Sequence, residues 1–457
     1  MKLKKIAMLL AIAGFATPVL ATNGYFAHGY GMTAKGMGGA ATAMDKDSFG
    51  GANNPASMVW VGERLDVGLD FFSPKRSVER TGSVAGINGS AESGSNMFLV
   101  PEFGYNKMMG ANMSAGVTVY GNGGMNTNFP GGQIQGGPGT VCNQFNPGTA
   151  ATRYNLLCGN GDLGMNMIQL IVAPTVAMKV NQNHSFGVSL LLGYQQFAAR
   201  GLQGFVGFTP NPATGGANLT NIGYDTSSGY GLRLGWMGKI SDSVTLGAAY
   251  SSKMKMGKFD KYRDLFAGQG NFDIPDNMNV GISIKATPTV TVAADYQRIN
   301  IGSVNAPGNP STNVGNAQPQ TGYTIASLGC SNCRGFGWSN IGVFKLGAEY
   351  KYSPNLTLRA GYDHTDNPIQ PRDVTFNMIA PGVVQDHLTL GFTYSLSKSS
   401  EVTMAYMHAY ENSVTGSSLY NNWVTTTNGA PGGVGIAGNE TIRMYQNSLG
   451  IAYGMKF

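Results

Sequence analysis

Two pairs of neighbouring residues, Asp363–His364 and Asp386–His387, have the residue types required for acid–base chemistry. In a hydrolase, an aspartate orients such a histidine toward a nucleophile. Each pair lies, however, in a stretch where polar and apolar residues alternate, and neighbouring residues in a strand point to opposite faces of the sheet. Neither aspartate could then orient the histidine beside it, and the sequence contains no GxSxG motif. We therefore expect no catalytic residues and no enzymatic activity.

The four cysteines form the second group that could do chemistry: Cys142 with Cys158, and Cys330 with Cys333. A CxxC spacing such as Cys330 to Cys333 occurs in redox and metal motifs, but here it stands without partner ligands. Both groups fall in predicted loops outside the cell, where an oxidising environment favours disulfides. We expect one disulfide within each loop, no metal site and no cofactor.

The first residues predict export from the cytoplasm. Lys2, Lys4 and Lys5 precede an apolar stretch over residues 6–20, and small residues at its end indicate cleavage before Thr22. The alternative is a membrane anchor, for which the stretch is short and interrupted by Gly14. Lys and Arg exceed Asp and Glu only by 30 to 24, and they form no run, so nucleic acid is not an expected partner.

Alternation of apolar with small or polar residues runs through the rest of the chain. In residues 446–457, Leu449, Ile451 and Tyr453 alternate with Gly450 and Ala452. The two sets fall on opposite faces of a strand. A soluble β-sandwich also alternates, but it would expose many more Lys and Glu than the 12% of charged residues allow. One face therefore suits lipid.

Fourteen such stretches are predicted as strands, and an even number is what a single-chain bacterial barrel requires. They cover residues 64–72, 95–106, 111–121, 165–180, 184–198, 226–239, 243–255, 276–287, 290–301, 338–351, 355–366, 385–397, 400–412 and 442–457. Short turns alternate with long links along the chain. In such a barrel the short turns lie on the periplasmic side and the long loops lie on the outer side. The prediction is an all-β membrane protein, a 14-stranded antiparallel outer-membrane β-barrel over residues 64–457.

Residues 22–63 do not show the strand pattern. They are rich in Gly and Ala, with one or two helical turns possible over residues 32–44. Small residues such as Gly235, Gly347 and Gly391 recur on the inward parity and leave space in the lumen. We expect residues 22–63 to form a plug, or hatch, in that space; the alternative is a periplasmic tail.

Several motifs resemble those of the FadL/TodX family of outer-membrane transporters. They are Asn23-Gly24-Tyr25-Phe26, Lys35-Gly36-Met37-Gly38-Gly39-Ala40, Asn54-Pro55-Ala56, Tyr262-Arg263-Asp264-Leu265-Phe266, Phe272-Asp273-Ile274-Pro275, Arg359-Ala360-Gly361-Tyr362-Asp363 and Asn367-Pro368-Ile369. The resemblance implies passive transport of long-chain fatty acids or aromatic hydrocarbons through a barrel closed by a hatch. It also implies capture between two outer loops, near residues 200–225 and 256–276, and lateral exit at a kinked third strand.

Apolar residues in those two loops are the candidates for the capture groove. They are Leu202, Phe205, Phe208, Phe259, Tyr262, Leu265 and Phe266. The spacing from Phe259 to Phe266 predicts one apolar helix face, and an apolar patch on a long loop often marks a binding site. The alternative is that these side chains only pack the loops over the barrel mouth.

Bases of the inward parity or at the root of an outer loop could hold the carboxylate of a fatty acid. Arg200, Arg233 and Lys345 are the candidates, because a cation at one end of an apolar cavity suits such a ligand. The alternative is that each base pairs with an inward acid such as Asp295 or Asp363.

Pro101, Gly116 and Pro174 are ladder breakers in three neighbouring strands. We therefore expect the lateral exit beside them, with Gly116 nearest to the kink; ordinary bulges are the alternative.

Taken together, these patterns predict a monomer in the Gram-negative outer membrane that contacts lipid and a hydrophobic ligand, with terminal Phe457 as a signal for barrel assembly. A surface adhesin and a porin for polar solutes are the rival functions.

Overall fold

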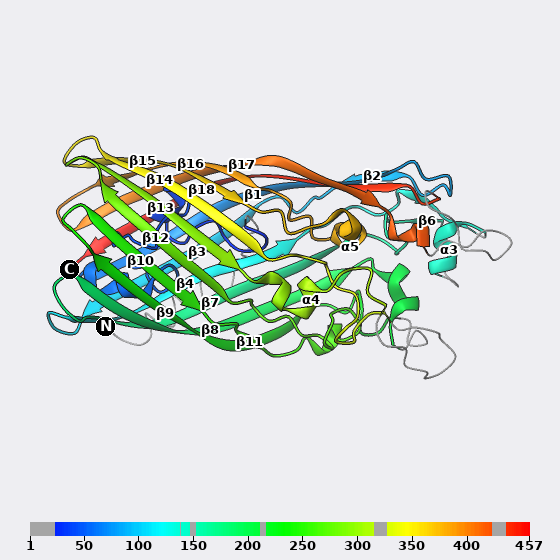
Figure 1. Cartoon of the computed structure of the whole chain (residues 1–457). Helices are drawn as coiled ribbons and strands as arrows, with labels where there is room; N and C mark the ends of the chain where they lie inside the picture. Colours follow the sequence, from blue (N-terminus) through cyan, green and yellow to red (C-terminus); the bar gives the residue numbers. More distant parts are fainter. Residues whose placement is uncertain (1–22, 138, 147–151, 211–215, 315–326, 423–435) are drawn as a thin grey trace.

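Strands that alternate between lipid-facing and inward-facing residues close into one antiparallel barrel in the computed structural model (Figure 1). The structure describes residues 23–137, 139–146, 152–210, 216–314, 327–422 and 436–457. The predicted leader, residues 1–21, lies outside them. The main sheet has 16 strands; β2 and β11 are short additions in the outer loops, and the remaining fourteen form the barrel wall. Pairing of β9 with β10 and of β1 with β18 closes the ring.

All fourteen predicted strands are confirmed. They are β1 (Arg64–Thr81), β3 (Phe98–Met108), β4 (Met113–Asn126), β7 (Gly164–Lys179), β8 (His184–Arg200), β9 (Asp225–Lys239), β10 (Val244–Ser251), β12 (Asn277–Lys285), β13 (Val290–Ile299), β14 (Ile341–Lys351), β15 (Leu356–Thr365), β16 (Asp386–Ser395), β17 (Ser400–Ser417) and β18 (Asn439–Lys456). The minor strands are β2 (Gly89–Glu92), β5 (Ile134–Gln135), β6 (Arg153–Tyr154) and β11 (Lys255–Met256).

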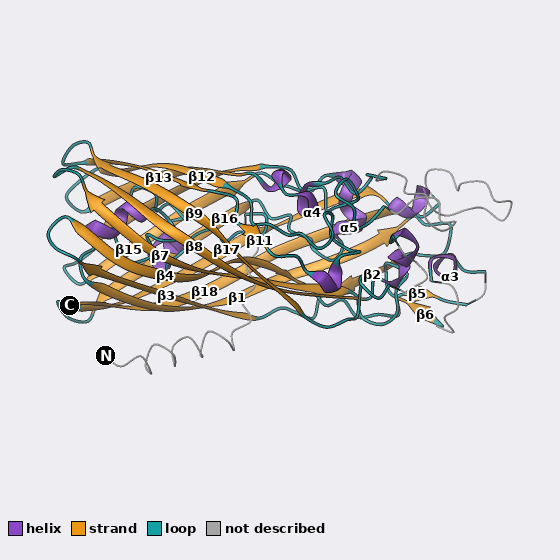
Figure 2. Ribbon diagram, turned by 90° about the horizontal axis from the view of Figure 1, so that it is seen from below, coloured by secondary structure: helices purple, strands orange, loops and turns teal. Residues whose placement is uncertain are grey.

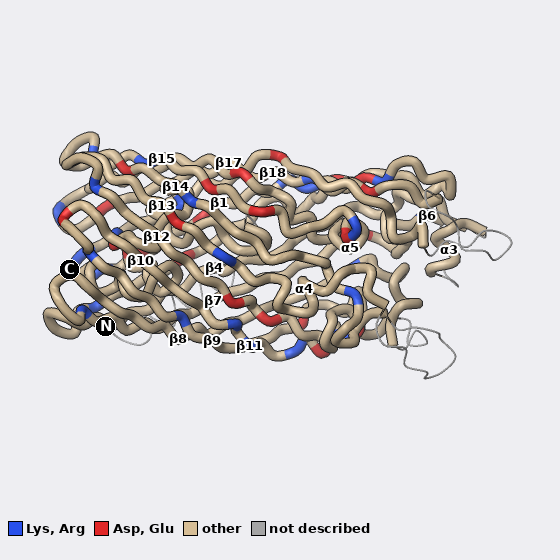
Figure 3. The backbone as a smooth tube through the Cα atoms, in the orientation of Figure 1, with Lys and Arg blue, Asp and Glu red and all other residues tan. Residues whose placement is uncertain are grey.

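The two faces of the wall differ as the alternation predicts. On β18, Leu449, Ile451 and Tyr453 are exposed on the outside, whereas Gly450 and Ala452 are buried inside. Figure 3 shows few charged residues along the wall, and Lys and Arg gather at the end with the short turns. In the described part of the chain no helix is long and apolar enough to cross a membrane.

Helices are short and lie in the lumen or in the outer loops (Figure 2). They are α2 (Met32–Gly36), α3 (Val141–Phe145), α4 (Asn305–Gly308), α5 (Val374–Asn377) and the 3-10 helices η1 (Pro55–Trp60), η2 (Gln203–Phe208), η4 (Asp260–Tyr262), η5 (Ile301–Ser303), η6 (Pro371–Asp373) and η7 (Leu419–Asn422). The single helix face predicted over residues 259–266 is therefore wrong. Only the three residues of η4 are helical there, and turns bring the apolar side chains to the same side.

A charge on the outer face tests the assignment of lipid contact. Leu390 lies midway along β16 with 54% of its surface exposed. Leu390→Lys should lower the free energy of unfolding by about 2–4 kcal/mol, because a lysine at the bilayer midplane loses its hydration. Leu396→Lys, in the turn after the same strand, should lower it by at most about 1 kcal/mol. Urea unfolding in lipid vesicles measures both; equal losses would contradict the assignment.

Candidate functional site

The segment before β1 fills the lumen and is bound to the wall by buried charges. Nζ of Lys35, on α2, lies 2.5 Å from Oδ2 of Asp70 and 3.9 Å from Oε2 of Glu102. All three side chains are buried. Such a pair gives little net stability, but removal of one partner leaves a buried charge uncompensated. Lys35 of the lumen segment therefore depends on the acids of β1 and β3 for its counter-charge.

Inward acids also accept backbone hydrogen bonds from this segment. Oδ2 of Asp295 accepts from the amides of Ala41 and Thr42 at 2.8 and 2.9 Å. Oδ2 of Asp66 accepts from the amide of Ser48 at 2.9 Å. The lumen segment has little regular structure of its own, so strand carboxylates satisfy amides that helix or sheet would otherwise satisfy.

The motif residues Asn54, Pro55 and Ala56 form a turn against β9. Nδ2 of the Asn54 side chain donates to the carbonyl of Trp236 at 2.9 Å, and its Oδ1 accepts from the backbone amide of Ala56 at 3.1 Å. Pro55 is the first residue of η1, where its missing N–H leaves no bond unmade. Since all three motif residues are buried against the wall, this turn fixes the end of the lumen segment before β1.

The third strand of the wall, β4, is irregular. Its register against β7 shifts between Gly121 and Gly123, and its pairing with β3 ends at Val119. Beyond that point the first described residues of the chain bond to it instead. The amide of Gly124 donates to the carbonyl of Tyr25, and the amide of Ala27 donates to the carbonyl of Asn122, each at 3.2 Å.

Of the three predicted ladder breakers, Gly116 and Pro174 lie below this irregularity, whereas Pro101 lies at its level, two residues beyond the last β3–β4 pair, Phe103 with Val119. Pro101 faces Leu69 of β1, Gly116 pairs regularly with Asn106 and Thr175, and Pro174 faces Val117. The β4 groups that bond to the lumen segment are the carbonyl of Asn122 and the amide of Gly124, where the sequence Gly121-Asn122-Gly123-Gly124 could have indicated a bulge.

Four of the predicted groove residues meet in an apolar pocket between the outer loops. Leu202, Phe205, Leu265 and Phe266 line it, together with residues of two further loops that the sequence reasoning missed. These additional lining residues include Phe336, Phe376 and Ile379. Phe205 and Phe376 stack with ring centroids 5.2 Å apart. The cavity between them measures ≈ 10 Å³, so the pocket is closed by its own side chains.

The other predicted groove residues pack beside this pocket. Phe259 and Tyr262 contact Phe197 of β8 with ring centroids 5.7 and 4.6 Å apart. Phe208 lies under the guanidinium of Arg334, whose Cζ is 5.9 Å from the ring centroid. Arg334 lines the pocket itself, and burial lowers its pKa to about 10, so it stays a cation at neutral pH.

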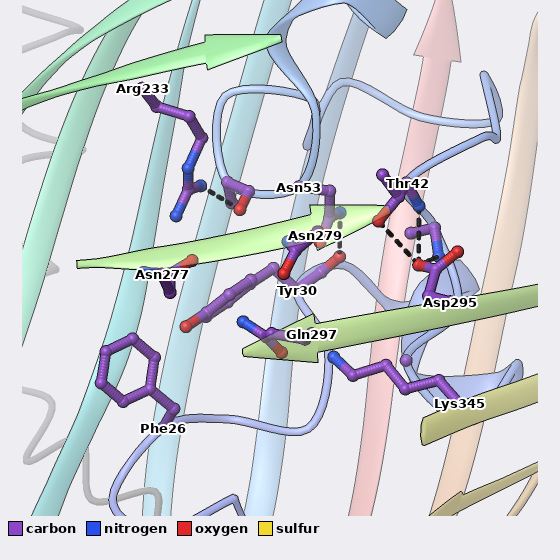
Figure 4. A pocket seen from close by; sticks show the side chains of 13 residues that line it. Phe26, Tyr30, Thr42, Asn53, Arg233, Asn277, Asn279, Asp295, Gln297 and Lys345 are labelled. Atoms are coloured by element: carbon purple, nitrogen blue, oxygen red, sulfur yellow. Dashed lines mark hydrogen bonds between the residues drawn. The ribbon is translucent and has the colours of Figure 1, made fainter. Parts of the chain in front are cut away.

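Two of the three candidate bases share a second, internal cavity, shown in Figure 4. Arg233 donates to the carbonyl of Gly51 at 3.0 Å, and Nζ of Lys345 donates to the carbonyl of His28 at 2.9 Å. Both bases thus bind backbone of the lumen segment. Arg200 lies apart on the exposed outer rim, where it donates to Oδ1 of Asn128 at 3.1 Å.

The cysteines are joined as Cys142–Cys158 and Cys330–Cys333, within the loops over residues 127–163 and 300–340. The described residues contain no cluster of His, Cys, Asp and Glu that could hold a metal ion.

The two Asp–His pairs meet across strands rather than along them. Register places Asp363 opposite His387 and His364 opposite Asp386, with Nδ1–Oδ1 distances of 3.0 and 2.7 Å. Each histidine thus contacts an aspartate of the neighbouring strand and not the aspartate beside it in the chain. The first pair is buried in the lumen and the second faces outward, so they form no common site.

A closed barrel with an apolar outer face, a filled lumen and an apolar pocket at its outer mouth defines a class of protein. It is a channel of the outer membrane for small hydrophobic molecules. The sequence model of the outer membrane protein transport proteins (OMPP1/FadL/TodX) matches residues 13–432. The chain therefore belongs to this family of transporters, which are not enzymes.

Solved structures share the fold. The toluene transporter TodX of P. putida superposes with a TM-score of 0.63 at 19% identity, over 94% of this chain and 99% of that one. The toluene transporter TbuX of Ralstonia pickettii gives 0.62 at 20% identity, over 94% and 99%. A FadL homologue of Pseudomonas aeruginosa gives 0.63 at 13% identity, over 95% and 99%. No curated protein matches the sequence.

The contact between the lumen segment and β4 can be tested at Gly123. A Cβ there would lie 1.6 Å from the carbonyl oxygen of Tyr25, so Gly123→Ala should force residues 25–27 off the strand. A cysteine introduced at Phe26, which is 2% exposed, should then react with maleimide about tenfold faster or more. Gly94→Ala is the control, since a Cβ there meets its nearest atom at 3.7 Å. Equal labelling of both variants would show that the segment does not lie on β4.

Proposed function

We propose that this transporter takes up long-chain fatty acids, which it captures in the pocket between the outer loops and releases laterally through the wall beside β4. The proposal rests on the hydrogen bonding of β4, the third strand of the wall. Beyond Val119, the lumen segment replaces β3 as the hydrogen-bonding partner of β4. Withdrawal of residues 25–27 would leave a gap in the wall without breaking any pairing of β4 with β7. Residues 22–63 thus act as a hatch.

The capture pocket suits an amphipathic carboxylate. Leu202, Leu265, Phe266 and Phe376 supply apolar surface, and Arg334 supplies a cation at the same cavity. An apolar cavity with one placed charge is the usual form of such a site. Arg233 and Lys345 lie deeper, beside the hatch, where a carboxylate could compete with the backbone carbonyls that they now bind.

An aromatic hydrocarbon is the second candidate ligand. Phenyl rings dominate the capture pocket, with Phe205 and Phe376 stacked and Phe266 and Phe336 beside them. Ring-lined pockets favour aromatic guests through offset and edge contacts. TodX and TbuX are toluene transporters, and an aromatic hydrocarbon of this kind is the second ligand class that we propose for this chain.

We also propose that the barrel is a monomer and that Phe457, 65% exposed at the chain end, is read by the barrel-assembly machinery.

Uptake into cells that lack their own transporters tests capture. Phe376→Asp should lower uptake of labelled oleate about tenfold or more, because it places a carboxylate in an apolar, desolvated pocket. Val84→Asp, in an outer loop at 83% exposure, should have no effect. Labelled toluene in the same assay separates the two ligand classes. Full oleate uptake by Phe376→Asp would exclude this pocket from the route.

Deletion of residues 22–56 tests the hatch. Planar-bilayer conductance should change from nearly none to a stable open pore, because the deletion removes the segment that fills the lumen. Heat-modifiable migration on gels controls for barrel assembly. A correctly assembled deletion variant that conducts no ions would contradict a hatch, as would a wild-type protein that already conducts like a porin.

A further inference from the structure

Two histidines, one from the lumen segment and one from the wall, stack inside the barrel. His28 belongs to the lumen segment and His387 to β16, and their ring planes differ by 11°, with centroids 6.2 Å apart. The two residues are only 2% and 0% exposed. Nε2 of each ring has no hydrogen-bond partner among the described residues. Neither the capture pocket nor the contact with β4 uses this pair of titratable side chains.

The charged and titratable groups that face His28 are all bases. They are His387 on β16, Lys35 on α2 and Lys345 on β14. Nζ of Lys345 also donates to the backbone carbonyl of His28 at 2.9 Å. Burial, first of all, and then repulsion from these bases hold the pKa of His28 well below its ordinary value. The imidazole is therefore neutral at neutral pH while the lumen segment is in place.

The acids in this part of the lumen are engaged by other groups. Oδ1 of Asp363 lies 3.0 Å from Nδ1 of His387, and its Oδ2 accepts from Nδ2 of Asn23 at 3.2 Å. Lys35 is held by acids of β1 and β3. No acid of the described chain faces His28. A proton on His28 would thus be a buried charge without a counter-charge, which is strongly unfavourable.

His28 occupies the weakly held end of the lumen segment. It follows residues 25–27, which bond to β4, and it precedes Lys35, whose ion pair holds the next part of the segment. Release of residues 25–28 would expose the imidazole to water while Lys35 stays in place. The same displacement therefore uncovers β4 and relieves the burial of His28.

The direction of the pH effect follows from this difference between the two positions. A histidine whose pKa is lowered in the closed state binds a proton more tightly after release, so acid favours release. Exposed histidine titrates near about pH 6.5, so the closed state keeps its full stability above that value. Each pH unit below it shifts the equilibrium up to about tenfold toward release, until the lowered pKa of the closed state is reached. Asp47, whose pKa burial raises to about 6, lies in the part that stays in the lumen and does not enter this equilibrium.

We propose that His28 is a pH sensor whose protonation releases residues 25–28 from the wall, so that the lateral path beside β4 opens in mildly acidic surroundings. The inference rests on the proposed function and adds to it regulation by pH. The proton comes from water. Repulsion from Lys345 opposes return of the charged ring to its place beside His387, and loss of the proton lets the segment close again.

Maleimide labelling of a cysteine at Phe26, in the full-length protein in nanodiscs, tests the sensor at about pH 7 and about pH 5.5. Each rate is divided by that of a cysteine at Val84, which is 83% exposed, to correct for the effect of pH on the thiol itself. The normalised rate should rise about eightfold at the lower pH, as expected for a group that titrates near pH 6.5 once released. His28→Gln cannot gain a charge and should abolish the rise.

His184→Gln is the matched control, since His184 is a half-buried histidine at the start of β8, and it should keep the full rise. Heat-modifiable migration on gels verifies assembly, and His28→Asn serves as a second neutral replacement. Absence of a rise in the protein that retains His28 would overturn the sensor, whichever variants assemble. An equal rise in an assembled His28 variant would overturn it as well.

Uptake of labelled toluene, which carries no charge at either pH, should increase in parallel with labelling. Faster labelling without faster uptake would refute the link between His28 and the lateral path. Uptake that proceeds equally at both pH values would remove the sensor and leave the transporter intact. Absence of uptake of any apolar probe at either pH would instead refute the proposed function.

Discussion

Backbone hydrogen bonding in lipid is the constraint on which this structure depends. A strand at membrane depth has no water to satisfy its amides, so each must pair within a closed sheet or with protein inside it. The described wall meets this condition through antiparallel pairing, which is interrupted by a bulge in β17 between Ala409 and Asn412 and, more extensively, where β4 continues beyond its pairing with β3. There the carbonyl of Tyr25 and the amide of Ala27 take over. The lumen segment thus fills the lumen and, beside β4, also takes the place of a strand in the wall.

The strands could be predicted from the sequence because successive side chains of a strand point to opposite faces and the bilayer requires one of these faces to be apolar. A residue such as Leu449 must face lipid and its neighbour Gly450 must face the crowded lumen. The order of apolar and small residues along the chain therefore shows which face each residue occupies. The upper parts of β1 and β17 were missed, since Ser77, Glu79 and Arg80 rise above the lipid and no longer alternate by polarity. The predicted helix near Phe259 failed because turns satisfied the same spacing.

The site was predictable only where its residues come from one loop. Leu202 with Phe205, and Leu265 with Phe266, were found as local apolar clusters, but Phe376 arrives from a loop more than a hundred residues away and carries no local signal.

The contacts of the lumen segment are unevenly distributed along it, and this decides which part can open most easily. Residues 25–27 are held to β4 by single backbone hydrogen bonds, each contributing about 0.5–1.5 kcal/mol. Lys35 is held by a buried ion pair, and separating such charges without water costs about 3–5 kcal/mol. Tyr25 also packs against Phe272, which contacts Phe266 of the capture pocket. In the proposed route, a ligand that displaces Phe266 would therefore disturb the packing around Tyr25, while the ion pair of Lys35 would keep the rest of the segment in the lumen.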